Sequence, residues 1–426
     1  MKKSSTISIF TSLIIVALLL SNCKKEETEE GQKELKNTII TKVPEIKINK
    51  VNFYFENSAS MNGYLDGKDF KQTMHRIIDD KNPNFKTFFV NTKQYDAKNI
   101  LSKIDNKNIK TLGIASSDHQ FIFNNAINSA IDNNLSIVVT DGIYSTPSGD
   151  IDIVEIEIEK VFTKALNSNA IETVVLKMTS NYIGTYYTES PNCGNDIINQ
   201  ERPYYILLFG NKGVINKALK DIVNVKSLGG YQNQARFFLT KEMKVDYSVL
   251  LNGEEKKGSF RPDGNSSPMK SIEQTEKYTP NGMSIKDAYL QFAIAVDFSK
   301  TYIPEEYLVE KVNYTIDPNT DYKIVEIKKI DNISKETKDE VGRKLKNATH
   351  IIVVKGKSQL FGDLNIHLNI NTPSWISETG TINDCSIKND TTKTIAFDKL
   401  MKGISKAYEE INDKNEYLTL SINIKP

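Results

Sequence analysis

Two short stretches of the chain, FYFENSASMNGY at 53–64 and SIVVTDGIYS at 136–145, decide the fold that the sequence predicts. Each begins as an apolar run that is typical of a buried strand, and each ends in hydroxyl and carboxyl side chains. The polar side chains at these strand ends are Glu56, Ser58, Ser60 and Asp141. Because the carboxyl ends of parallel strands meet at one edge of an α/β sheet, we expect these side chains to lie together.

Apolar runs alternate with amphipathic stretches along residues 46–225. The pattern predicts strands at 50–56, 85–90, 109–115, 135–140, 171–178 and 203–209, and helices at 69–80, 120–133, 152–167 and 213–223. Strands that alternate with helices of this length are typical of a parallel α/β sheet. We therefore predict an α/β domain, with a parallel sheet, over 46–225.

The pattern changes after residue 225. Residues 226–392 contain β-type runs that are separated by turns rich in Gly, Pro, Asn and Asp, which is typical of an antiparallel, sandwich-like domain. A helix is predicted at 393–412 from its apolar face, and a final strand, EYLTLSINI, follows it. The sequence thus predicts a β-rich second domain with a C-terminal helix over 226–426. It does not show which domain this helix contacts.

Residues 1–22 have the pattern of a secretory signal peptide, with a basic start and an apolar stretch that is short for a membrane span. The stretch ends in LSNC, which resembles a bacterial lipobox, whose cysteine is lipidated and becomes the mature N-terminus. The resemblance implies that Cys23 carries a lipid and anchors the protein to a membrane. A plain signal peptide with an incidental cysteine is the alternative.

Residues 23–45 begin with the charged run KKEETEE, which cannot pack into a core and predicts a solvated tether. A lysine and acidic residues directly after the lipidated cysteine resemble the surface-export signal of Bacteroidota lipoproteins. The resemblance implies an outer-membrane lipoprotein that is displayed on the cell surface. Attachment to the leaflet that faces the periplasm stays open.

The charges of the chain are balanced, with 55 lysines and arginines against 54 aspartates and glutamates. A balance of this kind argues against nucleic acid as a partner. Apart from Cys23, the chain has two cysteines, Cys193 and Cys385. In an oxidising compartment these two thiols could form a disulfide, and two free thiols are the alternative.

Three elements of the first domain occur in a known order. The motif ENSAS at 56–60 lies between the first strand and the first helix and resembles the DxSxS signature of von Willebrand factor A domains. The SIVVTDG stretch resembles the strand that carries a metal-associated aspartate in that family, and a serine of 116–117 stands where the family has a threonine. The resemblance covers about 46–225 and implies a metal-ion-dependent adhesion site for Mg²⁺, or for Mn²⁺ or Ca²⁺. The metal-site residues that it implies are Glu56, Ser58, Ser60, Ser116, Ser117 and Asp141.

The chemistry of these residues suits such a cation. Oxygen ligands without histidine or cysteine favour Mg²⁺, which takes near-octahedral oxygen at about 2.0–2.1 Å. The hydroxyl groups of Ser58 and Ser60 can bind it directly, because alternate residues of a loop can face the same way. Glu56 and Asp141 can hold metal-bound waters. With few anionic ligands, the cation stays positive enough to bind the carboxylate of a partner.

A structural interpretation of the same residues stays open. Glu56 stands where the family has Asp, and its additional methylene changes the geometry around a metal. Without a metal, Glu56, Ser58 and Ser60 would form a hydrogen-bonded turn. Ser117 with Gln120 fits a capping box at the start of the following helix.

Three classes of function fit the sequence. The first is an envelope-anchored lipoprotein that binds a protein or glycan partner through the cation. The second is a metal-dependent hydrolase of phosphate or sulfate esters. Such enzymes gather more carboxylates and histidines around the metal, and His119 is the only histidine near these motifs. The third is a metal-independent envelope scaffold. We favour the binding protein over the enzyme.

Overall fold

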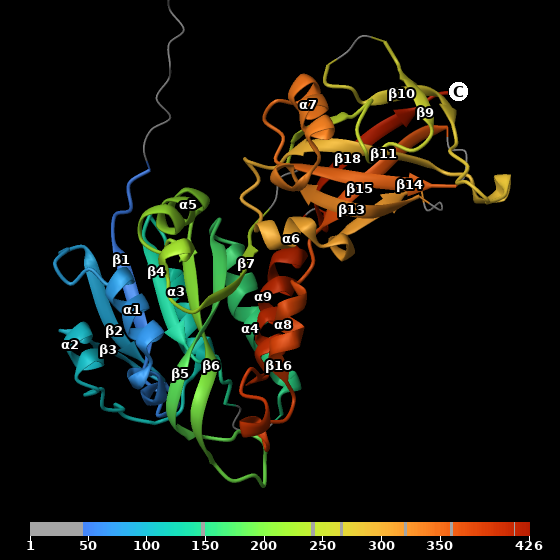
Figure 1. Cartoon of the computed structure of the whole chain (residues 1–426). Helices are drawn as coiled ribbons and strands as arrows, with labels where there is room; N and C mark the ends of the chain where they lie inside the picture. The colour runs from blue at the N-terminus through green and yellow to red at the C-terminus, as the bar shows by residue number, and fades with distance from the viewer. Residues whose placement is uncertain are drawn as a thin grey trace, which may run out of the picture. The chain divides into compact units, whose positions relative to one another are not determined.

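The protein is seen in a computed structural model, which describes residues 46–145, 150–239, 243–264, 267–318, 322–357, 361–412 and 414–426 (Figure 1). The predicted signal peptide, the lipidation of Cys23 and the tether over 23–45 lie outside these residues. Residues Ile46–Pro426 form one compact unit. Among the described residues, no helix is both long enough and apolar enough to cross a bilayer.

A seven-stranded sheet, in the order β3-β2-β1-β4-β6-β5-β7, forms the first part of this unit. Its strands are β1 Val51–Glu56, β2 Phe85–Val90, β3 Gln94–Asp96, β4 Leu135–Thr140, β5 Glu172–Tyr186, β6 Asp196–Gly210 and β7 Tyr231–Phe237. β1 runs parallel to β2 and β4, and the other pairs are antiparallel. The predicted α/β class is confirmed, whereas the prediction of a wholly parallel sheet is wrong because the sheet is mixed.

The sheet differs from the prediction at two places for physical reasons. β5 and β6 are joined directly by residues 187–195, and a connection without a crossover helix joins antiparallel neighbours. Residues 109–115, predicted as a strand, form none. The amide nitrogens of Asn57 and Asn91 donate to backbone carbonyls of this segment, and Leu112 N donates to Asn57 Oδ1. Side-chain amides thus make the hydrogen bonds that a neighbouring strand would make.

Helices cover both faces of the sheet. They are α1 Lys68–Ile77, α2 Ile100–Asp105, α3 His119–Ser129, α4 Asp152–Leu166 and α5 Lys212–Asp221, of which only α2 was not predicted. Phe70 of α1 packs on Tyr204 of β6, whereas Phe123 of α3 packs on Phe209 of the same strand. Because side chains alternate along a strand, Tyr204 and Phe209 point to opposite faces. α1 and α3 therefore cover opposite faces of the sheet.

Two smaller sheets, in the orders β12-β15-β18-β10-β9 and β13-β14-β11-β8, follow in the chain. Their strands are β8 Asp246–Val249, β9 Ser259–Pro262, β10 Ser271–Glu276, β11 Leu290–Asp297, β12 Tyr314–Asp317, β13 Lys323–Lys329, β14 His350–Gly356, β15 Gly362–Asn369 and β18 Glu416–Ile424. All their pairs are antiparallel except β10 with β18. Phe292 of β11 and Leu420 of β18 are buried in one core that both sheets share. Helices α6 Glu305–Val309 and α7 Lys335–Lys344 belong to this region.

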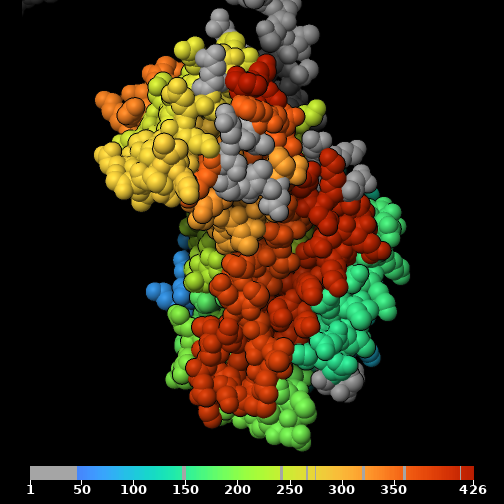
Figure 2. Space-filling view, turned by 90° about the vertical axis from the view of Figure 1, so that its right-hand side faces the viewer, coloured from blue at the N-terminus to red at the C-terminus, as the bar shows by residue number. Residues whose placement is uncertain are grey.

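The C-terminal helix α9, Phe397–Ile411, packs against α4 of the first sheet (Figures 1 and 2). Phe397 and Tyr408 on its apolar face are buried in the core of the seven-stranded sheet. At Gly403 the two helices approach so closely that a Cβ atom would lie 2.5 Å from the backbone oxygen of Glu155. The short elements α8 Ser374–Thr379, β16 Gly380–Thr381 and β17 Thr394–Ile395 precede this helix. The C-terminal helix therefore packs against the first region of the protein. The sequence did not show which of the two regions it would contact.

Candidate functional site

Parallel pairing of β1 with β4 brings the two strand ends to one edge of the sheet. Phe55 of β1 pairs with Val139 of β4, so Glu56 and Thr140, the last residues of these strands, lie side by side. Asp141 follows Thr140 directly, and its side chain is buried. The structure therefore places the carboxyl groups of Glu56 and Asp141 at the same edge.

Glu56 is held by a threonine that the sequence did not single out. The Thr140 hydroxyl donates a hydrogen bond to Glu56 Oε2, and its oxygen accepts one from Gly142 N at 2.8 Å. His119 Nε2 lies 3.3 Å from the same oxygen. Because the only hydroxyl proton is directed to Glu56, the imidazole must donate from Nε2. Burial lowers the pKa of His119 to about 4, which agrees with a neutral ring at pH 7.

Ser58 and Ser60 face the same way, as their alternate positions predict. Their hydroxyl oxygens lie 3.1 Å apart, and both side chains are largely buried. Between them, Ala59 N donates to the backbone oxygen of Ala115 at 3.2 Å, which ties this loop to the segment that carries Ser116 and Ser117. The loop thus presents two neighbouring hydroxyl groups in a fixed position.

Ser116 and Ser117 differ in their surroundings. Ser116 is exposed, whereas Ser117 is buried, and its hydroxyl lies near enough to Glu56 to influence the pKa of that carboxyl group but makes no hydrogen bond of ordinary geometry with the described residues. The residue that caps α3 is Asp118, whose Oδ1 accepts from Phe121 N at 3.0 Å. The capping-box alternative for Ser117 is therefore wrong, and its hydroxyl is available to another group.

The two carboxyl groups are buried together. Burial, and the negative charge of the neighbouring Glu56, raise the pKa of Asp141 from 3.8 to about 7. Burial also raises the pKa of Glu56, and the hydroxyl groups of Ser117, Thr140 and Ser58 oppose that rise. Asp141 Oδ2 has no hydrogen-bond partner among the described residues. A positive charge bound at this edge of the sheet would therefore stabilise the ionised forms of Glu56 and Asp141.

A pocket of about 270 Å³ opens at this edge. Of the residues that the sequence singled out, Glu56, Ser58, Ser60, Ser116 and Ser117 line it. Asp141 is not part of the lining, although its carboxyl group is close enough to the Ser60 hydroxyl to be influenced by it. Ser145, Tyr187 and Glu189 complete the polar lining from other segments, and the sequence did not single out Ser145 or Glu189 for this site.

The segment that carries Tyr187 and Glu189 is fastened by a buried aspartate. Asp384 accepts hydrogen bonds from the backbone nitrogens of Glu189 and Ser190, at 3.0 and 2.9 Å, and from the Tyr186 hydroxyl at 2.9 Å. Tyr187 is 42% exposed, whereas four other tyrosines of β5 and β6 are buried: Tyr182, Tyr186, Tyr204 and Tyr205. Of these aromatic side chains, Tyr187 is thus the one that reaches the pocket.

The same segment carries a disulfide. Cys193 is joined to Cys385, with their Cα atoms 5.2 Å apart and a sequence separation of 192 residues. Cys385 follows Asp384 directly, so the bond and the aspartate fasten the same two segments. The wall of the pocket that contains Glu189 is therefore held to a distant part of the chain.

The donor set is one that a divalent cation could take. Hydroxyl oxygens of Ser58, Ser60 and Ser117 lie at the pocket, with the carboxyl groups of Glu56 and Asp141 close to them. Hard cations bind such oxygen ligands. Among the described residues there is no group of three or more His, Cys, Asp or Glu side chains that could hold a metal ion. Any cation here would therefore depend on the serine hydroxyls.

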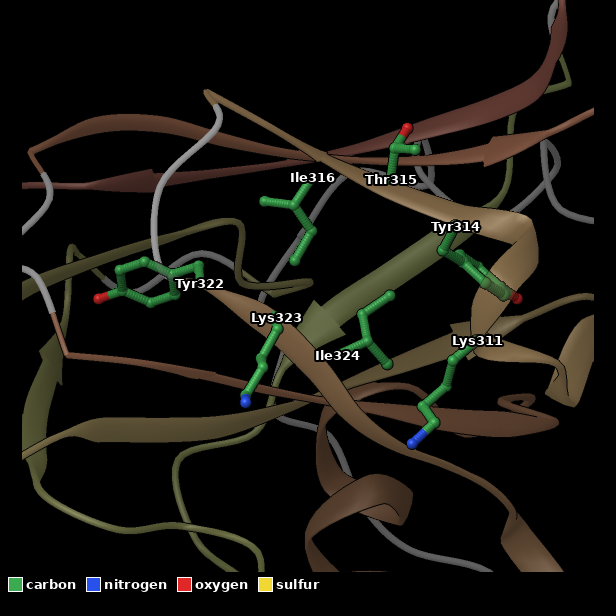
Figure 3. A pocket seen from close by; sticks show the side chains of 7 residues that line it. All are labelled: Lys311, Tyr314, Thr315, Ile316, Tyr322, Lys323 and Ile324. Carbon is green, nitrogen blue, oxygen red and sulfur yellow. The ribbon is translucent and has the colours of Figure 1, made fainter.

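A second pocket, of about 490 Å³, lies in the β-rich region (Figure 3). Its lining residues are Lys311, Tyr314, Thr315, Ile316, Tyr322, Lys323 and Ile324. The Lys311 ammonium group donates to the backbone oxygen of Val325 at 3.2 Å. The described residues of this lining carry no carboxyl, imidazole or thiol group.

No protein-family model matches this chain, and none of the curated proteins or solved structures compared with it is similar.

Proposed function

We propose that this protein binds a protein or glycan partner through a divalent cation at the edge formed by β1 and β4. The ligands would be the hydroxyl groups of Ser58, Ser60 and Ser117, with Glu56 and Asp141 as supporting carboxylates. Mg²⁺ is the cation that such ligands suit best, and Mn²⁺ or Ca²⁺ could replace it. The von Willebrand factor A domains, which the motifs resemble, bind their ligands in this manner.

The observation that carries the proposal is a set of buried oxygens without partners beside a pocket. Ser117 Oγ and Asp141 Oδ2 receive no hydrogen bond from the described residues. Buried polar groups are nearly always partnered, so each such atom calls for an explanation. A cation with its bound waters would partner these oxygens and would offset the charges of the two carboxylates. The vacant position on the cation would then accept a carboxylate from the partner.

A binding role fits this edge better than hydrolysis of an ester. A hydrolase needs a base that reaches the substrate, and because His119 does not line the pocket, that task would fall to the carboxyl groups of Glu56 and Glu189 in its described lining. His119 Nε2 is directed to Thr140, and the ring stacks on Tyr144 with 5.2 Å between ring centroids. His119 thus supports the site from inside the fold.

Calorimetric titration of Mg²⁺ and Mn²⁺ into the purified protein tests the proposal. We expect binding to the parent protein and none to a variant that combines Ser58→Ala with Ser60→Ala. The matched control combines Ser299→Ala with Ser377→Ala, two exposed serines, and should bind as the parent does. No binding to the parent, or undiminished binding to a folded Ser58/Ser60 variant, would refute the cation site and favour the scaffold.

We further propose that Cys23 carries the lipid of an outer-membrane lipoprotein whose folded part is displayed at the cell surface. Protease added to intact cells should then degrade the protein. A Cys23→Ser variant should no longer partition with membranes. Protection in intact cells, with cleavage only after lysis, would place the protein on the periplasmic side.

A further inference from the structure

Glu189 gives the pocket a second acidic group that belongs to a different segment from the proposed cation ligands. It lines the same pocket as Ser58 and Ser60. It does not join Glu56 and Asp141 in a metal-binding group, because the described residues form no cluster of three such side chains. Its carboxylate is therefore available to a group of the ligand other than the one that would bind the cation.

The position of Glu189 is fixed, but its charge is not balanced. Its Oε1 accepts a hydrogen bond from Ser145 Oγ at 2.7 Å, and its backbone nitrogen donates to Asp384. No lysine, arginine or histidine among the described residues pairs with it. Burial, together with the charges of Asp384 and Asp141, raises the pKa of Glu189, and the hydrogen bond from Ser145 opposes this rise. A half-buried carboxylate among other acids is best stabilised by a cationic group from a ligand.

An apolar strip adjoins this carboxylate. Tyr187 lines the pocket and is 42% exposed, and Ile183 of β5 is 43% exposed. Ile197 of β6 is 78% exposed and lies opposite Thr185, which is two residues from both Ile183 and Tyr187. Because alternate residues of a strand share a face, Ile183 and Ile197 lie on one face of the hairpin, next to Tyr187. Exposed aliphatic side chains of this kind suit the apolar side chains of a protein better than a glycan.

We propose that the partner at this site is a protein segment in which an acidic residue, a basic residue and an apolar residue lie close together. The acidic side chain would bind the cation held by Ser58 and Ser60, the basic side chain would pair with Glu189, and the apolar one would cover Tyr187 and Ile197. The inference rests on the proposed function, because its acidic residue needs the cation. The requirement for a basic residue depends on Glu189 alone.

Selection from a library of random peptides displayed on phage tests the inference. The immobilised protein is offered the library in Mg²⁺ and Mn²⁺, and in parallel with a chelator. We expect the cation-dependent peptides to carry an acidic residue next to lysine or arginine, with an apolar neighbour. Synthetic copies of an enriched peptide, with the basic residue replaced by glutamine, should bind roughly tenfold more weakly.

The variant Glu189→Gln isolates the basic-residue preference. It keeps an acceptor for Ser145 and removes the charge, and selection on it should still enrich acidic residues but not basic ones. Glu201→Gln, which alters an exposed glutamate on the same hairpin, should select the same peptides as the parent. Melting temperatures of both variants check that they are folded.

The outcomes separate the two proposals. Peptides that are acidic but not basic, selected equally by the parent and by Glu189→Gln, would overturn the role of Glu189 and leave the cation site standing. Failure to enrich any peptide on a protein that binds Mg²⁺ in the calorimeter would overturn the protein partner. Enrichment that is unaffected by the chelator would contradict the cation-dependent function itself.

Discussion

Thr140 donates a hydrogen bond from its hydroxyl group to the carboxylate of Glu56, and this contact joins the ends of β4 and β1. The same oxygen accepts hydrogen bonds from Gly142 N and from His119 Nε2. A hydroxyl group has one proton and two lone pairs, so all its capacity is used. Thr140 therefore fixes the orientation of Glu56 and the turn after β4 at the same time.

Replacing Thr140 by valine should destabilise the protein. The substitution keeps the shape but leaves Gly142 N and Glu56 without their buried partner, which costs about 1–3 kcal/mol. We expect a loss of that size in the free energy of unfolding, measured with urea. Thr140→Ser restores the hydroxyl group and should recover most of the loss. A valine variant as stable as the parent would show that the contact contributes nothing.

Asp141 should make the cation-free protein less stable as the pH rises. Its folded pKa of about 7 lies above the ordinary value of 3.8, so the folded chain holds this proton more tightly than the unfolded chain. The stability that this proton contributes is present below about pH 4 and is lost between about pH 4 and pH 7. Measured without divalent cations, the free energy of unfolding of the parent should fall relative to Asp141→Asn over that range.

His119 acts in the opposite sense over much of this range. Its folded pKa of about 4 lies below the ordinary 6.5, so its contribution is present above about pH 6.5 and is lost as the pH falls towards 4. This contribution is present in both proteins, but it cancels only in part, because the charge of Asp141 is one of the influences on the pKa of His119. Equal pH dependence in the two proteins would contradict the raised pKa of Asp141.

Cation affinity should rise with pH for the same reason. A cation favours the ionised form of Asp141, so protons compete with it below about pH 7. We expect calorimetry at about pH 6 to give a weaker Mg²⁺ affinity than at about pH 8, with proton release on binding at the lower pH. An affinity that does not change across this range would mean that Asp141 takes no part in holding the cation.

Gly63 should be essential to the short 3-10 helix Ser60–Asp66, which begins at Ser60. A Cβ atom at this position would lie 2.3 Å from the ring of Tyr182, so Gly63→Ala must displace the ring or this helix. We expect a loss of about 1–3 kcal/mol in the free energy of unfolding and a weaker cation affinity. Gly194→Ala is the control, because nothing lies within 4 Å of its Cβ position, and it should change neither quantity.

The contact between α4 and α9 can be tested with two helical glycines. Gly403→Ala would place a Cβ atom 2.5 Å from the backbone oxygen of Glu155, and we expect it to lower the melting temperature. Gly342→Ala in α7 meets nothing within 4 Å and should stabilise the protein by roughly 0.5–1 kcal/mol, since alanine is the better helix former. If both substitutions raised the melting temperature, the close approach at Gly403 would be refuted.

The strands that flank the site could be predicted because their sequences are decisive on their own. LSIVVT at 135–140 is an apolar run bounded by polar residues, and β4 has the predicted bounds. The segment 109–115 has similar strand-forming residues, but asparagine side chains from two other segments take its hydrogen bonds. The antiparallel direction of β5 and β6 was missed because the sequence pattern of the two strands is the same for either direction.

The candidate site was predicted only in part for a similar reason. Glu56 and Asp141 stand where buried strands end, and such positions are recognisable in a sequence. Thr140 is the last residue of an apolar strand and carries no signal that it would meet a carboxylate on the next strand. Glu189 reaches the pocket from a hairpin connection that Asp384 fastens, and that contact spans 195 residues of sequence. Contacts over such distances are decided by tertiary packing.

The packing of α9 on α4 has a consequence for how the chain is made. Because a ribosome synthesises the chain from its N-terminus, the apolar surface of the first sheet that α9 covers is complete long before Phe397–Ile411 emerges. This surface therefore stays uncovered until α9 is available, long after the strands of the sheet have been made. The seven-stranded sheet, although its strands come first in the chain, reaches its final packing only after most of the β-rich region has been synthesised.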